Sequence, residues 1–113
     1  MQTIDRKQLK QRMGKDEPFL LIDVLGPDHY REGHLPDAIS IPLKSEHFVD
    51  RVEEKAGGKE MDIIVYCANT DCDASPRAAK ELEEAGFKNV YDFEAGLEGW
   101  EKTGEPVVAT ATT

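Results

Sequence analysis

The stretch Met61-Asp62-Ile63-Ile64-Val65-Tyr66-Cys67 decides the fold of this chain. It is an apolar, β-branched run of the kind found in strands buried on both faces, and it ends on a cysteine. After a polar segment, Ser75-Pro76 provides an N-cap residue and a first-turn proline for a helix. A buried strand, a loop and a helix in this order predict one unit of an α/β domain with a mainly parallel sheet.

The same alternation of strands and helices continues on both sides of this stretch. We expect, in chain order, a helix capped by Asp5 and ended by Gly14, a strand over 19–23, a short helix over 27–33, a strand over 38–41, a helix from about 45 to 55, a strand over 90–93 and a short helix over 96–100. No internal repeat or linker divides the chain. The sequence therefore predicts one domain over residues 1–108 and a disordered tail over 109–113.

Composition limits the class of protein. The chain has 113 residues and a net charge of −9, so a nucleic acid or an anionic membrane is not an expected partner. The longest uncharged apolar stretch, residues 63–68, is too short to span a bilayer, and the N-terminus has no apolar signal core. Two cysteines five residues apart do not form a secreted disulfide framework. We therefore expect a cytoplasmic protein.

Cys67 occupies the position where α/β domains usually bind ligands. In open α/β sheets, ligands bind at the carboxyl ends of strands, beside the start of the following helix. Backbone N–H groups and the helix dipole there stabilise a thiolate or a bound anion. Because the thiolate is the nucleophilic form of cysteine, Cys67 is the candidate catalytic residue. By position alone, the alternative is a small apolar side chain that ends a buried strand.

Three segments resemble the rhodanese (sulfurtransferase) domain. They are Leu21-Ile22-Asp23-Val24 with the downstream Gly33-His34-Leu35-Pro36-Asp37-Ala38, then Ile64-Val65-Tyr66-Cys67, and finally Gly96-Leu97-Glu98-Gly99-Trp100 with Gly104-Glu105-Pro106-Val107. The resemblance implies a single rhodanese-like domain whose cysteine takes sulfane sulfur from a donor, holds it as a persulfide and passes it to a nucleophile. Cys67 would be this carrier. The implied partners are a small sulfane-sulfur donor and an acceptor thiol, with a protein as a further candidate acceptor, and no cofactor.

The loop after Cys67 departs from the family pattern, which is shorter and rich in Arg and Gly. Here it has no Gly and carries Asp71 and Asp73, and Leu25 stands where the family often has Arg. Carboxylates disfavour a nearby thiolate and repel anions, so the loop predicts poor activity toward thiosulfate. We expect Ser75 to be first of all a helix cap whose hydroxyl can secondarily assist Cys67, and Arg77 to face the loop carboxylates, a bound anion or solvent. The candidate substrate-binding residues are Ala68, Asn69, Thr70, Asp71, Asp73, Ala74, Ser75 and Arg77.

Cys72 is the second candidate catalytic residue. A thiol five residues further along a loop can come within disulfide distance of Cys67 and interconvert persulfide and disulfide. Three interpretations stay open: a resolving thiol, an incidental loop thiol, and the primary nucleophile, since Cys72 and Arg77 have the cysteine–arginine spacing of the usual loop. No metal site is expected, because two sulfurs need two further ligands and the histidines lie in other segments.

Other functions remain open on the sequence. The cysteine pair also fits a thiol–disulfide redox protein, and the acidic loop fits a non-catalytic binding or regulatory module. Phosphatase or arsenate-reductase chemistry fits less well, because Cys67 and Arg77 are ten residues apart with two carboxylates between them. We expect Asp23 and His34 to be structural and Trp100 to lie in the core or to cover the loop from beneath.

Overall fold

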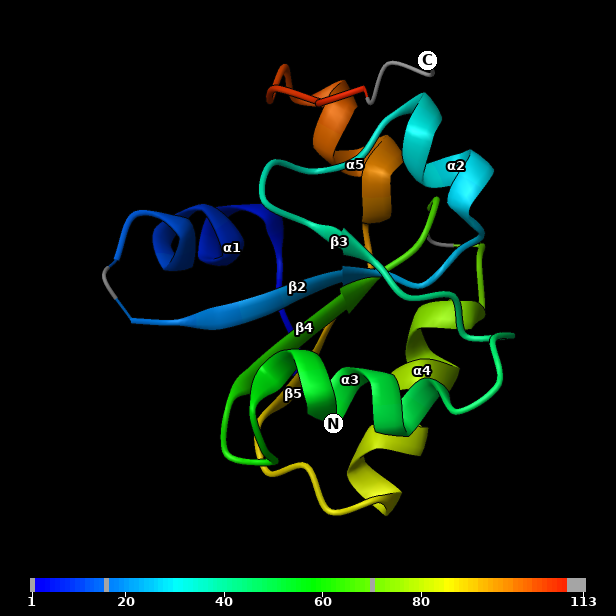
Figure 1. The fold of residues 1–113 in the computed structure, drawn as a ribbon. Coiled ribbons are helices and arrows are strands. Elements are labelled where there is room, and N and C mark those ends of the chain that lie inside the picture. The colour runs from blue at the N-terminus through cyan, green and yellow to red at the C-terminus, as the bar shows by residue number, and fades with distance from the viewer. Residues whose placement is uncertain (1, 16, 70, 110–113) are drawn as a thin grey trace.

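The fold centres on a five-stranded sheet. The structure is a computed structural model and describes residues 2–15, 17–69 and 71–109. The strands are β1 (Gln2–Thr3), β2 (Phe19–Asp23), β3 (Ile39–Ser40), β4 (Asp62–Tyr66) and β5 (Val90–Phe93). They pair in parallel in the order β1-β5-β4-β2-β3 (Figure 1). The predicted parallel sheet is confirmed, and the strand that leads to Cys67 lies at its centre.

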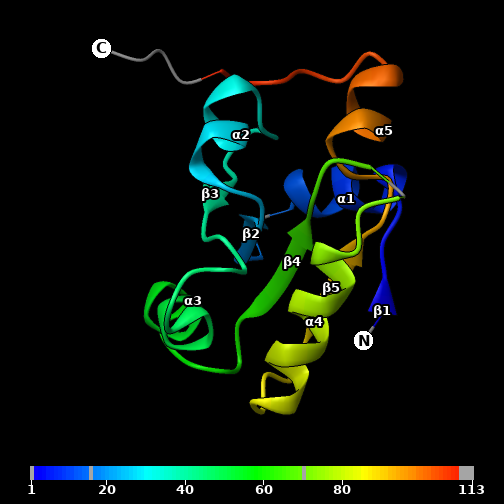
Figure 2. The ribbon, with the colours of Figure 1, turned by 90° about the vertical axis from the view of Figure 1, so that its right-hand side faces the viewer.

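Helices cover both faces of the sheet (Figures 1 and 2). They are α1 (Arg6–Met13), α2 (Pro27–Glu32), α3 (Phe48–Ala56), α4 (Ala74–Glu84) and α5 (Gly96–Lys102). Along β4, Ile63 and Val65 pack with α3 and α4, whereas Ile64 and Tyr66 pack with α1 and α5. Successive side chains of a strand point to opposite faces, so a strand buried on both sides must be apolar throughout. This explains the composition of the central strand.

Most predicted elements occur within one or two residues of their expected bounds. Asp5 and Gln8 form the capping box that starts α1. α3 begins at Phe48, about three residues later than expected, because His47 has a left-handed backbone with φ of 61°. The sequence analysis missed β1, whose two residues are too few to show a pattern.

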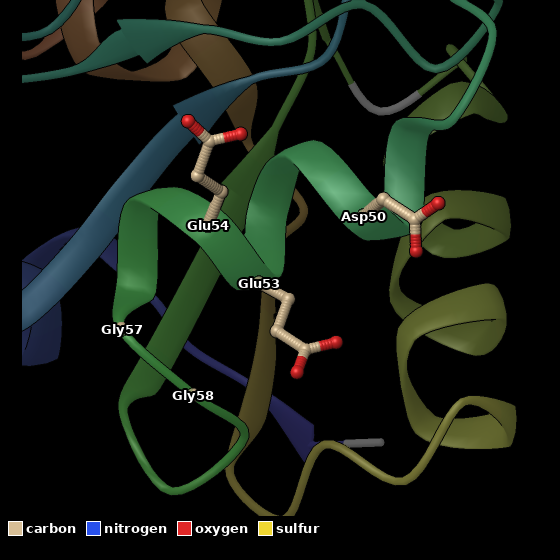
Figure 3. A pocket seen from close by; sticks show the side chains of 5 residues that line it. All are labelled: Asp50, Glu53, Glu54, Gly57 and Gly58. Carbon is tan, nitrogen blue, oxygen red and sulfur yellow. The ribbon is translucent and has the colours of Figure 1, made fainter.

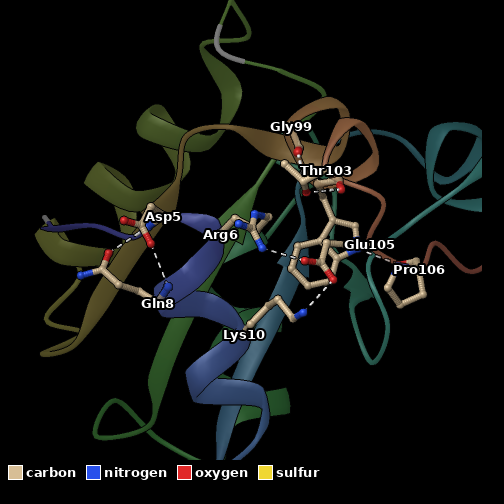
Figure 4. A network of polar contacts seen from close by, with 9 residues as sticks. Asp5, Arg6, Gln8, Lys10, Gly99, Thr103, Glu105 and Pro106 are labelled. Atoms are coloured by element: carbon tan, nitrogen blue, oxygen red, sulfur yellow. Dashed lines mark hydrogen bonds and ion pairs between the residues drawn. The ribbon is translucent and has the colours of Figure 1, made fainter.

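The C-terminal segment folds back onto α1 and the core. Glu105 accepts from Arg6 at 2.7 Å and forms an ion pair with Lys10 at 3.0 Å (Figure 4). Trp100 is buried as expected, and its Nε1 donates to the carbonyl of Pro106 at 2.6 Å. Of the predicted tail, only Ala109 lies within the described residues. Among the residues that the structure describes, no helix is long and apolar enough to cross a bilayer.

Candidate functional site

Cys67 directly follows β4 and is held by the start of α5. Its side chain is 1% exposed. The N–H of Leu97 donates to the carbonyl of Cys67 at 2.9 Å, and the N–H of Glu98 donates to the carbonyl of Ala68 at 2.8 Å. The N–H groups of the first helical turn have no partner within a helix. In α5 they bind the backbone at the cysteine and fix its position.

Gly96 makes this contact possible. Its φ is +65°, and a Cβ there would lie 2.8 Å from the carbonyl carbon of Ala68 and 2.9 Å from the backbone nitrogen of Asn69. Such distances are too short for a side chain, so the approach of α5 to the loop requires glycine. The sequence analysis quoted Gly96 as part of a motif but missed its contact with the loop.

A tight turn brings Cys72 back to Cys67. The side-chain oxygen of Asn69 accepts from the N–H of Asp71 at 3.0 Å, and the backbone carbonyl of Asn69 accepts from the N–H of Cys72 at 3.2 Å. Cys67 and Cys72 form a disulfide with their Cα atoms 6.4 Å apart. The expectation that the two thiols can meet is confirmed. Thr70, between them, lies outside the described residues.

Ser75 does not cap α4, but its hydroxyl lies beside Cys67, as its secondary expected role requires. α4 begins at Ala74 with Asp73 at the N-cap position, so the prediction that Ser75 caps the helix is wrong. The earlier start places Ser75 in the first helical turn, where it is 2% exposed and faces the sheet. Its Oγ lies 3.4 Å from the Sγ of Cys67. A thiol can donate to this hydroxyl, and a thiolate can accept from it.

The charged loop residues lie at the surface. Asp71 is exposed, and Nη1 of Arg77 lies 3.9 Å from Oδ2 of Asp73 with side chains 68% and 82% exposed. Water screens such a pair strongly. Arg77 thus faces a loop carboxylate, which was one of its three expected positions. The structure brings Cys67, Cys72 and Ser75 together and leaves the loop charges in solvent.

A cleft of about 570 Å³ lies beside Cys72, between the turn after β2, the segment before α3, and α4. Four of the predicted site residues line it: Cys72, Asp73, Ala74 and Arg77. The remaining wall comes from residues 24–26, 42–44 and 81 and includes the apolar side chains of Leu25 and Leu43. The sequence analysis missed this wall, because its segments lie far from the cysteines in the chain.

A second hollow, of about 170 Å³, lies between the loop and β5. It is lined by Cys72, Ser75, Pro76, Asp92 and Glu94. Asp92 is 1% exposed, and its Oδ1 has no hydrogen-bond partner among the described residues. Burial raises the pKa of this carboxyl, and this effect is larger than that of a hydrogen bond from Ser75, which lowers the pKa. Asp92 was also missed, since one Asp in a strand carries no sequence signal.

Comparison with known families identifies the fold and the family. The Rhodanese-like domain model matches residues 5–103. The chain belongs to the rhodanese-like domain family. A sulfurtransferase of Allochromatium vinosum is 31% identical over 94% of this chain and 94% of its own length. The thiosulfate sulfurtransferase GlpE of Coxiella burnetii is 33% identical over 76% of this chain and 75% of its own.

A solved structure supports the same assignment. The Alr3790 protein of Anabaena matches this rhodanese-like domain with a TM-score of 0.82 and 32% identity over 96% of this chain and 94% of that one. Other relatives are longer, and the chain spans 24% to 44% of two of them. The expected single rhodanese-like α/β domain and its sulfurtransferase family are therefore confirmed.

Asp23 and His34 are structural in this rhodanese-like domain. Asp23 is buried, and its Oδ1 accepts from the N–H of Leu25 at 2.9 Å while its Oδ2 lies 3.2 Å from Nδ1 of His29. His34 is buried too, with Nδ1 2.8 Å from the carbonyl of Tyr30. Both side chains tie down the segments after β2, as the sequence analysis expected.

A third hollow lies at the C-terminal end of α3, lined by Asp50, Glu53, Glu54, Gly57 and Gly58. Figure 3 shows its three carboxylates pointing away from one another. The chain enters β4 shortly after Gly58, so the Gly57–Gly58 end of this hollow lies near the start of the strand that ends at Cys67. Within the described part of the chain, no group of three or more His, Cys, Asp or Glu side chains could hold a metal ion.

Proposed function

We propose that this rhodanese-like domain transfers sulfane sulfur through a persulfide on Cys67, and that Cys72 releases the sulfur by forming a disulfide with Cys67. One observation carries the proposal: Cys67, at the carboxyl end of the central strand, is paired with Cys72 at the mouth of a cleft. The sulfurtransferase relatives favour sulfur transfer over a purely redox role for the pair.

In the first half-reaction, the Cys67 thiolate attacks the outer sulfur of an organic persulfide, R–S–SH. A new S–S bond forms on Cys67 as the donor S–S bond breaks. The products are the persulfide Cys67–S–SH and the thiolate R–S⁻, which takes a proton from water. The backbone hydrogen bonds that Leu97 and Glu98 donate hold the loop at Cys67 during this exchange.

Two routes discharge the persulfide. A nucleophilic acceptor can take the outer sulfur and leave the Cys67 thiolate. Alternatively, the Cys72 thiolate attacks the Sγ of Cys67, forms the disulfide and expels HS⁻. A low-molecular-weight thiol then reduces the disulfide: one molecule forms a mixed disulfide with Cys72, and a second displaces the thiolate of Cys72. The Cα separation of 6.4 Å between the cysteines permits the second route without backbone rearrangement.

The cleft favours an organic persulfide over thiosulfate as the donor. Leu25 and Leu43 give it an apolar wall, and Lys44 contributes a cation that can pair with a carboxylate of the donor. Thiosulfate has no apolar part to bury, and Asp71 and Asp73 add negative charge at the loop. A small organic persulfide that bears a carboxylate matches this mixture of apolar and cationic groups.

A single-turnover experiment tests the cycle. The reduced protein is mixed with one equivalent of cysteine persulfide, and released sulfide and remaining thiols are measured over time. Wild-type protein should release sulfide in step with loss of both thiols as the disulfide forms. The Cys72→Ser variant should keep its persulfide until an acceptor thiol is added.

Two results would contradict the proposal. Equal sulfide release by the wild type and Cys72→Ser, without an acceptor, would remove Cys72 from the cycle. A wild-type protein that gains no sulfur would instead be a non-catalytic module. Cys67→Ser is the control, because it removes the proposed carrier and changes none of the residues that line the cleft.

A further inference from the structure

Asp92 is a buried carboxyl whose position needs an explanation. On β5 it lies opposite Val65 of β4 and Thr3 of β1, in the layer that α4 covers. It is 1% exposed, and its Oδ1 has no hydrogen-bond partner among the described residues. Burying a carboxyl without full pairing destabilises a fold, so such groups are uncommon unless they serve a function.

Asp23 provides the contrast within the same sheet. It lies on β2, the other neighbour of β4, and is equally buried. Both of its oxygens have partners, Leu25 and His29, which together shape the turn after the strand. The structural role of Asp23 thus accounts for its burial. Asp92 has no comparable set of partners and instead lines the hollow that also contains Cys72.

Ser75 connects Asp92 to the buried sulfur. Its hydroxyl lies 3.4 Å from Sγ of Cys67, and the same residue lines one hollow together with Asp92. A hydroxyl donates one proton while it accepts another, so it can pass a proton between a sulfur and a carboxyl. Asp92 and the exposed Glu94 line the same hollow of about 170 Å³, through which the carboxyl can exchange protons with water.

We propose that Asp92, acting through the hydroxyl of Ser75, supplies the proton to Cys67 when the Cys67–Cys72 disulfide opens. This assignment rests on the dithiol cycle proposed above. Ser75 contacts the reacting sulfur, whereas Asp92 is a positioning residue one hydroxyl away from it.

The steps balance in protons and electrons. An external thiolate, R–S⁻, bonds to Sγ of Cys72, and the S–S electron pair leaves on Cys67. The Cys67 thiolate takes the Ser75 hydroxyl proton as Ser75 takes the proton of the Asp92 carboxyl. The products are Cys72–S–S–R, a Cys67 thiol and an Asp92 carboxylate, which regains its proton from water in the hollow. Because Cys67 is 1% exposed, solvent is a poor direct donor to it.

The pH dependence follows from the surroundings of Asp92. Burial raises the pKa of its carboxyl, the hydrogen bond from Ser75 lowers it, and the charge of Glu94 raises it further. Thr3 and Val65, its neighbours on β1 and β4, are uncharged. The net pKa is raised, so Asp92 keeps its proton at pH values where an exposed Asp has lost it. Proton donation therefore operates at low pH and is lost as pH rises through the pKa of the folded protein.

The test is the rate at which dithiothreitol reduces the disulfide of the full chain at a series of pH values. The wild-type rate is divided by the Asp92→Asn rate, so that the ionisation of dithiothreitol cancels. We expect a ratio of about 10 or more at low pH that falls to one as Asp92 ionises. The same ratio, measured in proteins that carry Glu94→Gln, should keep its low-pH value. Its midpoint should move to lower pH, because the substitution removes a charge that raises the pKa of Asp92.

A ratio that does not change with pH would overturn the assignment, since a structural role for Asp92 affects all pH values alike. If Asp92→Asn does not fold, Ser75→Ala carries the same test, because it removes the connecting hydroxyl. Persulfide loading of Cys67 is measured separately on each protein. Normal persulfide formation on Cys67 with a rate ratio that does not change with pH contradicts the proton path alone. A pH-dependent rate ratio without persulfide formation on Cys67 contradicts the sulfur-transfer proposal alone.

Discussion

Cys67 and Cys72 are joined in one disulfide, yet the molecule builds their surroundings differently. Cys67 ends the central strand, is buried, and has its backbone held by the first turn of α5. Cys72 lies on the loop, is partly exposed, and lines a hollow on each side. The difference shows how one pair of sulfurs can divide two tasks. The fixed, sheltered sulfur suits a persulfide carrier, and the accessible one suits exchange with thiols in solution.

The largest expected effect separates the two cysteines directly. Cys67→Ser should lower steady-state sulfur transfer from an organic persulfide by about 1,000-fold or more, because the nucleophile is lost. Cys72→Ser should lower it by about 10-fold or less when the acceptor thiol is saturating, because the first half-reaction remains. Sulfide and product formation under matched conditions provide the measurement. The reverse order of effects would make Cys72 the carrier.

The second effect concerns the backbone that holds Cys67. Gly96→Ala should destabilise the fold by about 3 kcal/mol, because it adds a Cβ at φ of +65° against the backbone of the loop. Gly57→Ala is the matched control, with φ of +75° but no atom of the described residues within 4 Å of the new Cβ, and should cost about 1 kcal/mol. Unfolding in urea measures both. An equal loss of unfolding free energy in both variants would mean that the close approach of Gly96 to the loop does not contribute to stability.

A smaller effect is expected on the Cys72 side, in the cleft. Lys44→Ala should raise the KM for a carboxylate-bearing persulfide by about 3- to 10-fold and leave kcat unchanged, because the lost pairing acts on binding. Lys55→Ala, an exposed change on α3, should alter neither constant. Steady-state kinetics at constant ionic strength distinguish the two variants. An unchanged KM for Lys44→Ala would place the donor outside the cleft.

The smallest effect comes from the exposed loop charge. Asp73→Asn should raise kcat/KM for thiosulfate by about 2- to 5-fold at low salt, since one repulsive charge near Cys72 is removed. The gain should shrink at high salt, because the Asp73 side chain is 82% exposed and screened. Glu54→Gln, an exposed change in the last turn of α3, is the charge-matched control. A gain in kcat/KM that does not depend on ionic strength would instead indicate a change in structure.

The sequence predicts the strand of Cys67 because its signal is local. An apolar run buried on both faces has a recognisable composition, and the cysteine at its end follows from chain order. The cleft wall at Leu25 and Leu43 could not be predicted in this way, because it depends on turns from two other parts of the chain meeting α4.

The placement of side chains on α4 was harder still to predict. Ser75 has the residue type of a helix cap, and a helix that starts at Ala74 turns its hydroxyl to Cys67 instead. Asp92 looks like any polar residue of a strand until the packing of α4 shows that it is buried. Helix boundaries are uncertain by one or two residues from sequence, and here one residue changes the role of the side chain.

Whether Cys67 carries the sulfane sulfur is tested most directly by mass spectrometry of peptides from the Cys72→Ser protein after treatment with an organic persulfide. The account predicts one added sulfur atom on the peptide that contains Cys67, removable by a thiol reductant. An unmodified Cys67 peptide, together with added sulfur on Cys72 in the Cys67→Ser protein, would contradict it.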